Sequence, residues 1–319
     1  MSDPVLLRPN PRGELVPATR LAFRVGQQAG EVGRRLDVYL TRRYRGLSRS
    51  YLQSRIREGD VRVNGEVSRV SRRVRPGDQI VLVYGRNADR QLVADDLPIS
   101  ILHEDDDLIV VDKPSGVSSQ PRHRHVGGSM VNRLVHHLSA QAGEYCAPRV
   151  VHRLDYSTTG VVLYAKSEDA LRKIASQFRK RTVEKYYYAI VGGAPSADEF
   201  TIDAPIGRDP LVKEKRQVRE DGKASRSHVR VLERFEGFAA LEVRLETGRT
   251  HQIRVHLDHV GHAIASDDQY GDVDLPGLGR TALHAWRLGI LHPSRGVRVL
   301  FEAPIPADLL ATRASLAGR

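Results

Sequence analysis

The sequence is poor in cysteine and lacks long apolar runs. Cys146 is the only cysteine among the 319 residues, which excludes an intramolecular disulfide framework and a cysteine-rich metal cluster. No apolar run approaches the roughly 18 residues that a membrane-spanning helix needs. Met1 to Pro4 lead into no apolar signal core, so export is not indicated. We therefore expect a cytoplasmic protein that is not associated with a membrane.

Lysine and acidic residues are scarce relative to arginine. The chain has 42 arginines, 8 lysines and 39 acidic residues, and its formal net charge is +11. A surplus of this size favours a polyanionic partner such as nucleic acid or anionic lipid. Genomic codon bias would also enrich arginine, so the surplus is informative only where it clusters along the chain.

The basic residues cluster in residues 33–84, where thirteen arginines face five acidic residues. Apolar residues over 36–44 have helical spacing, and a second helix begins at Ser48 or Ser50 and ends at Gly59. Asn64-Gly65 then predicts a tight hairpin. A solvated surface would normally carry more balancing acids, so the pattern favours binding to a nucleic-acid backbone.

These residues resemble an S4-type RNA-binding domain over nearly the whole module. The matching segments are Arg35-Leu36-Asp37, Ser48-Arg49, Ile56, Gly59-Asp60-Val61, Val63-Asn64-Gly65 and Gly77-Asp78. Members of that family bind structured RNA through the helix pair. The resemblance therefore implies RNA contacts for Arg49, Arg55 and Arg57.

The rest of the chain predicts a larger domain. Residues 1–30 contain four prolines and no sustained periodicity, so they indicate a flexible leader, and the mixed charges of 85–98 indicate a linker. Residues 99–311 alternate strand-like runs with amphipathic segments. This mixture predicts an α+β fold with a mixed, mainly antiparallel central sheet and flanking helices, preceded by the small α+β module.

Two polar segments carry candidate catalytic residues. Asp155 lies in a polar turn before an apolar strand, where an aspartate commonly serves only to organise the turn. A second segment, residues 245–256, ends a strand and brings two arginines and two histidines together. An arginine facing Asp155 would lower the pKa of the carboxyl group and orient it. Spacing alone leaves open whether Arg254 or Arg249 does so, or whether these residues instead contact phosphate or form a surface ion pair.

Taken in order, several motifs resemble those of the RluA/RluD-type pseudouridine synthases from about residue 102 to residue 306. The motifs are Asp112-Lys113-Pro114-Ser115-Gly116, His152-Arg153-Leu154-Asp155, Lys185-Tyr186-Tyr187-Tyr188-Ala189, Gly222-Lys223, residues 247–256, Gly261-His262-Ala263-Ile264 with Asp267, Tyr270-Gly271 and Leu283-His284-Ala285.

The resemblance implies a role for each matching residue. Asp155 corresponds to the essential aspartate, Tyr187 to the tyrosine that stacks on the target base, and Arg254 to the basic partner of the aspartate. Arg153 corresponds to the arginine that enters the RNA helix where the uridine has left. The remaining substrate-binding candidates are Arg249, His152, Lys113 and Ile253.

The implied reaction conserves atoms, so we expect no redox cofactor, nucleotide or metal. One carboxylate acts on the sugar or the base, either as nucleophile or as proton acceptor.

His123 and His125 lack the clustered ligands of a metal site, and hydrogen bonding is the expected role of His251 and His256. Large-subunit ribosomal RNA is the expected substrate, with transfer RNA as the alternative. A catalytically silent RNA-binding or ribosome-assembly factor is the competing function, and a monomer is the default state.

Overall fold

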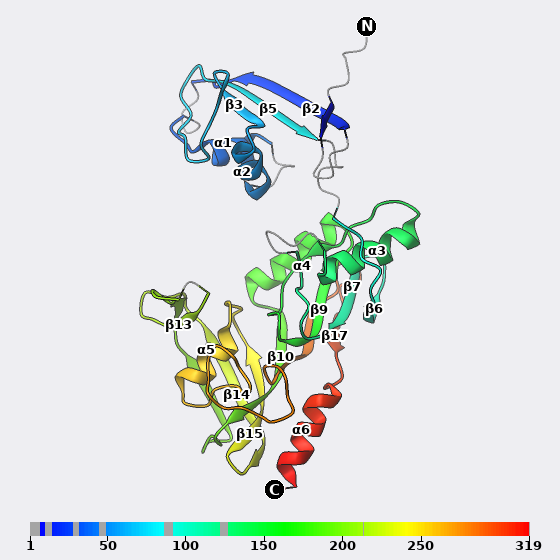
Figure 1. The fold of residues 1–319 in the computed structure, drawn as a ribbon, viewed down its shortest axis with the longest axis vertical. Helices are drawn as coiled ribbons and strands as arrows, with labels where there is room; N and C mark the ends of the chain where they lie inside the picture. Colours follow the sequence, from blue (N-terminus) through cyan, green and yellow to red (C-terminus); the bar gives the residue numbers. More distant parts are fainter. Residues whose placement is uncertain are drawn as a thin grey trace. The chain divides into compact units, whose positions relative to one another are not determined.

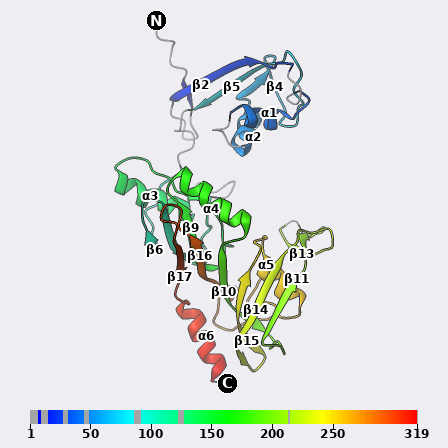
Figure 2. The same cartoon turned by 180° about the vertical axis from the view of Figure 1, so that it is seen from behind.

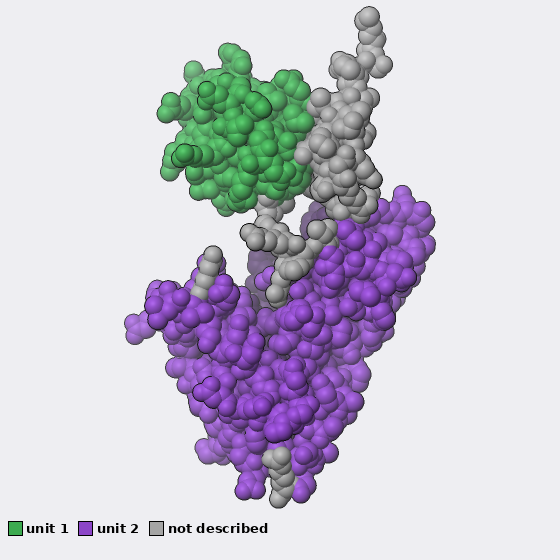
Figure 3. Space-filling view, viewed as in Figure 1, with its two compact units in different colours: residues 1–91 green, residues 92–319 purple. Residues whose placement is uncertain are grey.

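The structure is a computed structural model that describes residues 7–9, 15–27, 32–44, 49–85, 92–121, 127–212 and 214–318. The chain divides into two compact units, residues 1–91 (unit 1) and residues 92–319 (unit 2), which Figure 3 colours separately. Within the described ranges, no helix combines the length and the apolar character needed to span a bilayer.

Unit 1 is an antiparallel five-stranded sheet, in the order β1-β2-β5-β3-β4, that packs against two helices (Figure 1). Its elements are β1 (Leu7–Pro9), β2 (Leu15–Arg24), α1 (Leu36–Arg43), α2 (Arg49–Arg57), β3 (Val61–Val63), β4 (Glu66–Val67) and β5 (Gln79–Gly85). Leu40 of α1, Ile56 of α2 and Leu82 of β5 are fully buried in one apolar core. Both helices therefore present an apolar face to the sheet.

The local signals in unit 1 are largely reproduced. Asn64 and Gly65 both adopt positive φ, 54° and 87°, as a tight hairpin turn requires, and the chain leaves α2 through Gly59 at φ 83°. Ser48, one of the two N-cap candidates, lies outside the described residues. The leader expected for residues 1–30 is wrong where the structure describes it, because β2 pairs with β5 from Ala18 to Arg24.

Unit 2 contains a ten-stranded sheet in the order β11-β14-β15-β10-β16-β9-β7-β6, with β17 paired to β16 and β8 paired to β9 (Figures 1 and 2). The strands are β6 (Ser100–Glu104), β7 (Leu108–Lys113), β8 (Arg149–Val150), β9 (Thr159–Ala165), β10 (Glu184–Gly192), β11 (Glu199–Asp203), β14 (Arg226–Phe235), β15 (Phe238–Leu245), β16 (Leu283–Leu291) and β17 (Arg298–Glu302). The helices are α3 (Met130–Ala142), α4 (Glu168–Lys180), α5 (Gln252–His259) and α6 (Ala307–Ala317). A separate hairpin joins β12 (Ile206–Arg208) to β13 (Arg216–Val218). The α+β fold with a mainly antiparallel sheet is thus confirmed.

One half of the sheet is covered on both faces. Alternate residues of a strand point to opposite faces, and in β7 Ile109 belongs to the core formed with α3, whereas Leu108 belongs to the core formed with α4. Val162 and Val161 divide in the same way in β9. Burial on both faces explains why these strands are almost uninterrupted apolar runs in the sequence.

The other half of the sheet forms a second core around β10, β14 and β15. Ile253 and Leu257 of α5 and Leu309 and Leu316 of α6 belong to this core. Unit 2 therefore continues beyond residue 311, the boundary expected from the sequence.

Residues 92–98, expected to be part of the linker, are attached to unit 2. Leu92 donates its backbone N–H to the hydroxyl oxygen of Tyr145, and the carbonyl of Val93 accepts a 2.7 Å hydrogen bond from Asn132. Residues 86–91, the rest of that segment, lie outside the described part of the chain.

The two halves meet where β9 and β16 pair in parallel. The paired residues are Thr159 with His284 and Gly160 with Ala285. Gly160 has φ +110°, and a Cβ there would lie 2.2 Å from the carbonyl oxygen of Ala285. A glycine is therefore required for the two strands to approach this closely. Gly160 follows the turn that contains Asp155.

Candidate functional site

Asp155 lies in the loop between β8 and β9, and the preceding loop after β7 holds it in place. Gly116 donates its backbone N–H to the carbonyl of Tyr156, and Ser115 donates its hydroxyl to the carbonyl of Ser157, both at 3.0 Å. The hydroxyl of Ser119 also bonds the backbone of Leu154. The Asp155 side chain remains 31% exposed, so the loop is fixed while its carboxylate stays accessible.

Lys113 connects the loop after β7 with the loop that contains Asp155 through hydrogen bonds to both. Its ammonium group is fully buried and donates to the carbonyls of Pro114, Val117 and Tyr156 at 2.8, 2.9 and 3.3 Å. Burial lowers the pKa of Lys113 to about 7, although the charge of Asp155 opposes the shift. The expected contact of Lys113 with substrate is therefore corrected, because three backbone carbonyls accept its hydrogen bonds. Lys113 instead stabilises the conformation of the two loops.

Arg254, on the first turn of α5, faces Asp155. Its Nη1 lies 3.8 Å from Oδ2 of Asp155, and its side chain is only 5% exposed. Arg249 instead directs its guanidinium to the carbonyl of Ala224, at 3.1 and 3.3 Å. Of the two candidates that the spacing left open, the geometry thus pairs Arg254 with Asp155.

Asp267 orients the Arg254 guanidinium. Its two oxygens accept hydrogen bonds from Nε and Nη2 of Arg254, both at 2.5 Å, and its side chain is fully buried. The ring of Tyr270 lies 4.8 Å beneath the same guanidinium. A buried cation needs such a bidentate partner, and here the partner leaves Nη1 directed toward Asp155.

Tyr187, on β10, lies at the junction of the two halves and packs against both of their cores. Burial raises the pKa of Tyr187 well above its ordinary value, and the negative charge of Asp155 adds to the shift. The phenol therefore stays neutral beside the carboxylate. Tyr188 and Tyr186 occupy other environments: Tyr188 is buried in the core, and Tyr186 packs under the guanidinium of Arg287 at 4.9 Å.

His152 and Ile253, two other expected substrate contacts, pack within the fold instead. Nε2 of His152 accepts the backbone N–H of Leu163 at 3.0 Å, and its ring stacks on Phe178. Burial lowers the pKa of His152 to about 4, so the ring is neutral at pH 7. Ile253 is 4% exposed and belongs to the core around β10. Both expectations are corrected, whereas Arg153 is exposed next to Asp155, as a substrate contact requires.

The two histidines of the second segment differ in position. His256 is buried and bonds the hydroxyl of Ser227 and the carbonyl of Ala204, which is the structural role expected for it. His251 instead lies at the site, with Nε2 4.0 Å from Oδ2 of Asp155 and Nδ1 2.8 Å from the hydroxyl of Tyr270.

Sequence reasoning named Asp267 and Tyr270 only as parts of the matching motifs, and it gave His251 only a structural hydrogen-bonding role. Asp267 also accepts the backbone N–H groups of Gln269 and Tyr270, as in an ordinary Asx turn, and that turn is all that local spacing could indicate. The signal that could have found it is the buried Arg254, which requires a carboxylate partner from elsewhere in the chain.

An open hollow of about 640 Å³ lies beside the Asp155 loop. Its lining includes Ser115, Tyr156, Ser157, Asp267 and Asp268. This volume is within the range of small-molecule sites. The lining carries four aspartates, Asp267, Asp268, Asp272 and Asp274, and one arginine, Arg280, which disfavours an anionic group there.

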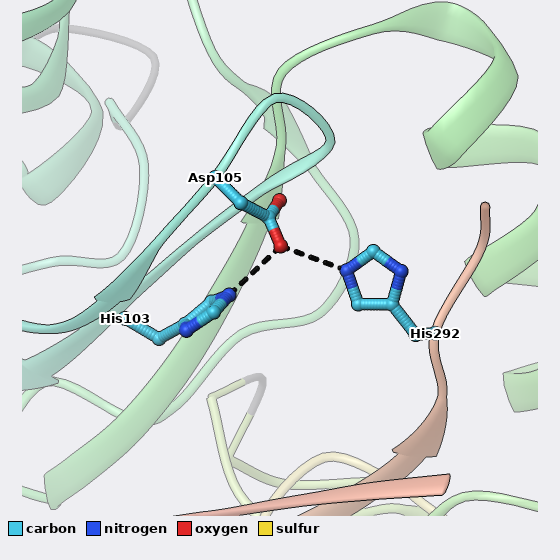
Figure 4. A group of neighbouring side chains, drawn as sticks. All are labelled: His103, Asp105 and His292. Carbon is cyan, nitrogen blue, oxygen red and sulfur yellow. Dashed lines mark hydrogen bonds and ion pairs between the residues drawn. The ribbon is translucent and has the colours of Figure 1, made fainter. Parts of the chain in front are cut away.

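A different cluster, His103, Asp105 and His292, has the residue types of a metal site (Figure 4). Nε2 of His103 and Nε2 of His292 lie 2.9 and 2.8 Å from the same oxygen of Asp105. Nδ1 of His292 accepts the backbone N–H of Arg295 at 3.3 Å, which leaves Nε2 as the nitrogen that donates to Asp105, whereas a metal would need the lone pair of Nε2. The donor set fits hydrogen bonds that connect β6 and the turn after it to the segment directly after β16. His123 and His125 lie outside the described residues.

In unit 1, a buried carboxylate connects the two helices. Asp37 of α1 accepts hydrogen bonds from Arg35, Arg49 and Gln53 at 3.0, 2.9 and 2.6 Å. Arg49 thereby anchors its Nε while its side chain remains 53% exposed, and Arg57 is exposed on the same helix. Both can meet a phosphate backbone.

Arg55 differs from the expectation of an RNA contact. Its side chain is 11% exposed and bonds Asp60 at 2.8 Å and Glu58 within the module. Its charge is thus compensated internally, and it stabilises the turn after α2.

Asp37→Asn is expected to destabilise unit 1 by about 2 kcal/mol at pH 7. Burial alone would raise the pKa of Asp37, but the bonds from Arg35, Gln53 and Arg49 lower it from 3.8 to about 2. A folded-state pKa below the unfolded value gives stability that is complete above about pH 5 and is lost as the pH falls toward 2. Hydrogen exchange of residues 34–80 in the full chain measures the difference.

Glu66→Gln removes the same charge from an exposed position of β4 and serves as the control. It should change the protection of residues 34–80 by no more than about 0.5 kcal/mol. Equal protection of the Asp37→Asn variant and the wild type at pH 7 would show that the three hydrogen bonds contribute no net stability.

Two family matches agree with this division of the chain. Residues 107–259 match the family described as RNA pseudouridylate synthase, and residues 34–80 match the S4 domain. The first match spans Asp155, Tyr187 and Arg254, and the second spans Asp37 and both helices of unit 1.

Similar proteins extend over nearly the whole chain. An RNA pseudouridine synthase of Bacillus subtilis is 38% identical over 277 residues, which are 86% of this chain and 91% of that protein. Ribosomal large subunit pseudouridine synthase D of Pseudomonas aeruginosa is 39% identical over 89% of this chain and 94% of its own. The structure of human RNA pseudouridylate synthase domain containing 1 matches 67% of this chain and 87% of its own, with a TM-score of 0.56 at 27% identity. The chain therefore belongs to the RNA pseudouridylate synthase family and is an RNA pseudouridine synthase with an S4 domain.

Proposed function

We propose that this enzyme isomerises specific uridines of large-subunit ribosomal RNA in the cytoplasm, with unit 1 anchoring the RNA. Relatives named ribosomal large subunit pseudouridine synthase D, from Pseudomonas aeruginosa and Nitrosomonas europaea, are each 39% identical to this chain over most of its length. The arginine surplus of residues 33–84 supports an RNA backbone as the partner of unit 1.

In this proposal Asp155 is the catalytic residue. Pseudouridylation breaks the bond between C1′ of ribose and N1 of uracil, rotates the base, and joins C1′ to C5. The proton on C5 leaves to solvent, and N1 gains a proton, so the atoms balance without a co-reactant. Asp155 acts on the sugar or the base, as nucleophile or as proton acceptor.

The surrounding residues have complementary roles. Arg254 orients Asp155, and Tyr187 offers its ring to the extracted base. Unstacking one nucleotide costs a few kcal/mol, and stacking on an aromatic ring returns about 1–3 kcal/mol. Exposed Arg153 enters the RNA helix at the position that the uridine vacates.

The observation that carries the proposal is the 3.8 Å approach of Arg254 to an accessible Asp155 beside Tyr187. A silent RNA-binding factor would have no use for a buried arginine clamped toward an exposed carboxylate. Incubating transcribed large-subunit ribosomal RNA with the protein, then mapping pseudouridine by carbodiimide-blocked primer extension, tests the proposal. New stops in that RNA support it, new stops in transfer RNA alone move the substrate to transfer RNA, and stops in neither support the silent factor.

Removal of residues 1–91 is expected to weaken RNA binding and to flatten its salt dependence. Every phosphate that the shortened protein no longer neutralises reduces the slope of log K against log salt by roughly 0.7–0.9. Filter binding from 50 to 300 mM salt measures this, and circular dichroism checks that residues 92–319 stay folded. Unchanged affinity and slope would show that unit 1 does not anchor the RNA.

A further inference from the structure

His251 is an additional residue of the site, and its backbone is unusual. It lies directly before α5 with φ 59° and ψ 22°, a left-handed conformation that non-glycine residues rarely adopt. Its side chain is 15% exposed, and its ring contacts the ring of Tyr270 edge to face at 5.5 Å. This backbone conformation and ring packing place the imidazole between Tyr270 and Asp155.

The hydroxyl of Tyr270 fixes which nitrogen of His251 carries the proton. This oxygen accepts the backbone N–H of Arg216, on β13, at 2.8 Å, and it also lies 2.8 Å from Nδ1 of His251. In the described part of the chain the hydroxyl proton has no other acceptor than Nδ1. Nδ1 therefore accepts, and Nε2 of the neutral ring carries the hydrogen.

The ring is held neutral by its surroundings. Burial lowers the pKa of His251, and the positive charges of Arg254 and Arg216 lower it further, against the opposing effect of Asp155 and Asp267. At pH 7 the group that faces Asp155 is thus an uncharged N–H donor.

Two donors of different charge approach the same oxygen of Asp155. Nη1 of Arg254 lies 3.8 Å from Oδ2, and Nε2 of His251 lies 4.0 Å from Oδ2. Both distances exceed a hydrogen bond by about 1 Å, and such contacts commonly tighten when substrate binds.

We propose that His251 is a positioning residue: its Nε2–H and Arg254 together fix Oδ2 of Asp155, so that Oδ1 is the oxygen presented to the uridine. This inference rests on the catalytic role proposed for Asp155. It also assigns Tyr270 a function, because the tyrosine hydroxyl sets the proton position on His251 while its ring supports Arg254.

Substitutions of His251 by side chains of different length test whether a donor at the position of Nε2 is needed. His251→Ala should lower the single-turnover rate of pseudouridine formation by about 10–100-fold, the effect of one hydrogen bond to a charged group, with the Kd for RNA within about twofold of wild type. His251→Gln places an amide N–H near the position of Nε2 and should recover the rate to within about fivefold.

His251→Asn is the matched control for the backbone. Asparagine tolerates left-handed φ better than glutamine does, but its amide reaches only the position of Nδ1. A purely structural role for His251 predicts that Asn is at least as active as Gln, whereas the positioning role predicts that Gln is faster by about fivefold or more. Tyr270→Phe retains the ring and should lower the rate by about fivefold or more without weakening RNA binding.

The outcomes separate this inference from the proposed function. A wild-type rate in both His251→Ala and Tyr270→Phe, with Asp155→Asn inactive, overturns the positioning role alone, as does an Asn variant that matches the Gln variant. Turnover by Asp155→Asn overturns the catalytic assignment itself. Circular dichroism identifies any variant that fails to fold, and Tyr270→Phe then decides the question.

Discussion

Asp155→Asn should reduce pseudouridine formation by about 10⁴-fold or more while RNA binding is retained. The amide keeps the size of the carboxylate but is neither a nucleophile nor a useful proton acceptor. Because a negative charge near a polyanion is removed, the affinity for RNA should stay equal or rise slightly. Tritium release from RNA that carries 5-tritiated uridine measures turnover, and filter binding measures affinity.

Glu144→Gln makes the same change of charge at an exposed position after α3 and should release tritium at the wild-type rate. Wild-type release by Asp155→Asn would remove the carboxylate from the mechanism. Loss of both release and binding would instead point to a disrupted loop, which circular dichroism would detect.

Asp267→Asn should cost about 3–5 kcal/mol of unfolding free energy and reduce turnover by roughly 100-fold. Arg254 is buried, and both of its bidentate hydrogen bonds go to Asp267. Removing one member of a buried ion pair leaves the other charge uncompensated. The Arg254 guanidinium would lose its fixed orientation, so that Nη1 is no longer held toward Asp155. Urea unfolding and single-turnover kinetics measure the two effects.

Asp268→Asn provides a neighbouring comparison. Its side chain is 84% exposed and lies 3.4 Å from the same Nη2 of Arg254. An exposed ion pair contributes little, so the unfolding free energy of this variant should lie within about 0.5 kcal/mol of wild type. Equal behaviour of the two variants would show that Asp267 is not the residue that orients Arg254.

The sequence predicted the α+β class and the long apolar strands because burial on both faces leaves a plain apolar signal, as in β7 and β9. It did not predict β2, since Pro17 and the surrounding irregular residues conceal the alternation of Leu21 and Phe23. That strand depends on pairing with β5, more than fifty residues away, and such pairing has no local signature.

In the site, Asp155, Arg254 and Tyr187 were predicted through resemblance, whereas their supports were not. Lys113 and His152 were predicted to contact substrate because they lie in the motifs that resemble the family. In the structure, Lys113 donates to backbone carbonyls and His152 accepts a backbone N–H. Asp267 was named in a matching motif but was given no role, because a turn explains it locally. Which polar groups meet inside a core is decided by tertiary packing, and spacing along the chain cannot show it.

The short parallel pairing between β9 and β16 has a consequence for how activity arises during biosynthesis. Asp155 lies before β9, Arg254 and Asp267 are made about a hundred residues later, and β16, which pairs with β9 at two residue positions, is made later still. A nascent chain that ends before β16 therefore lacks the strand that joins the two halves, and it is not expected to carry out the proposed reaction even though unit 1 is already present. The site is therefore expected to become complete only when β16 has paired with β9.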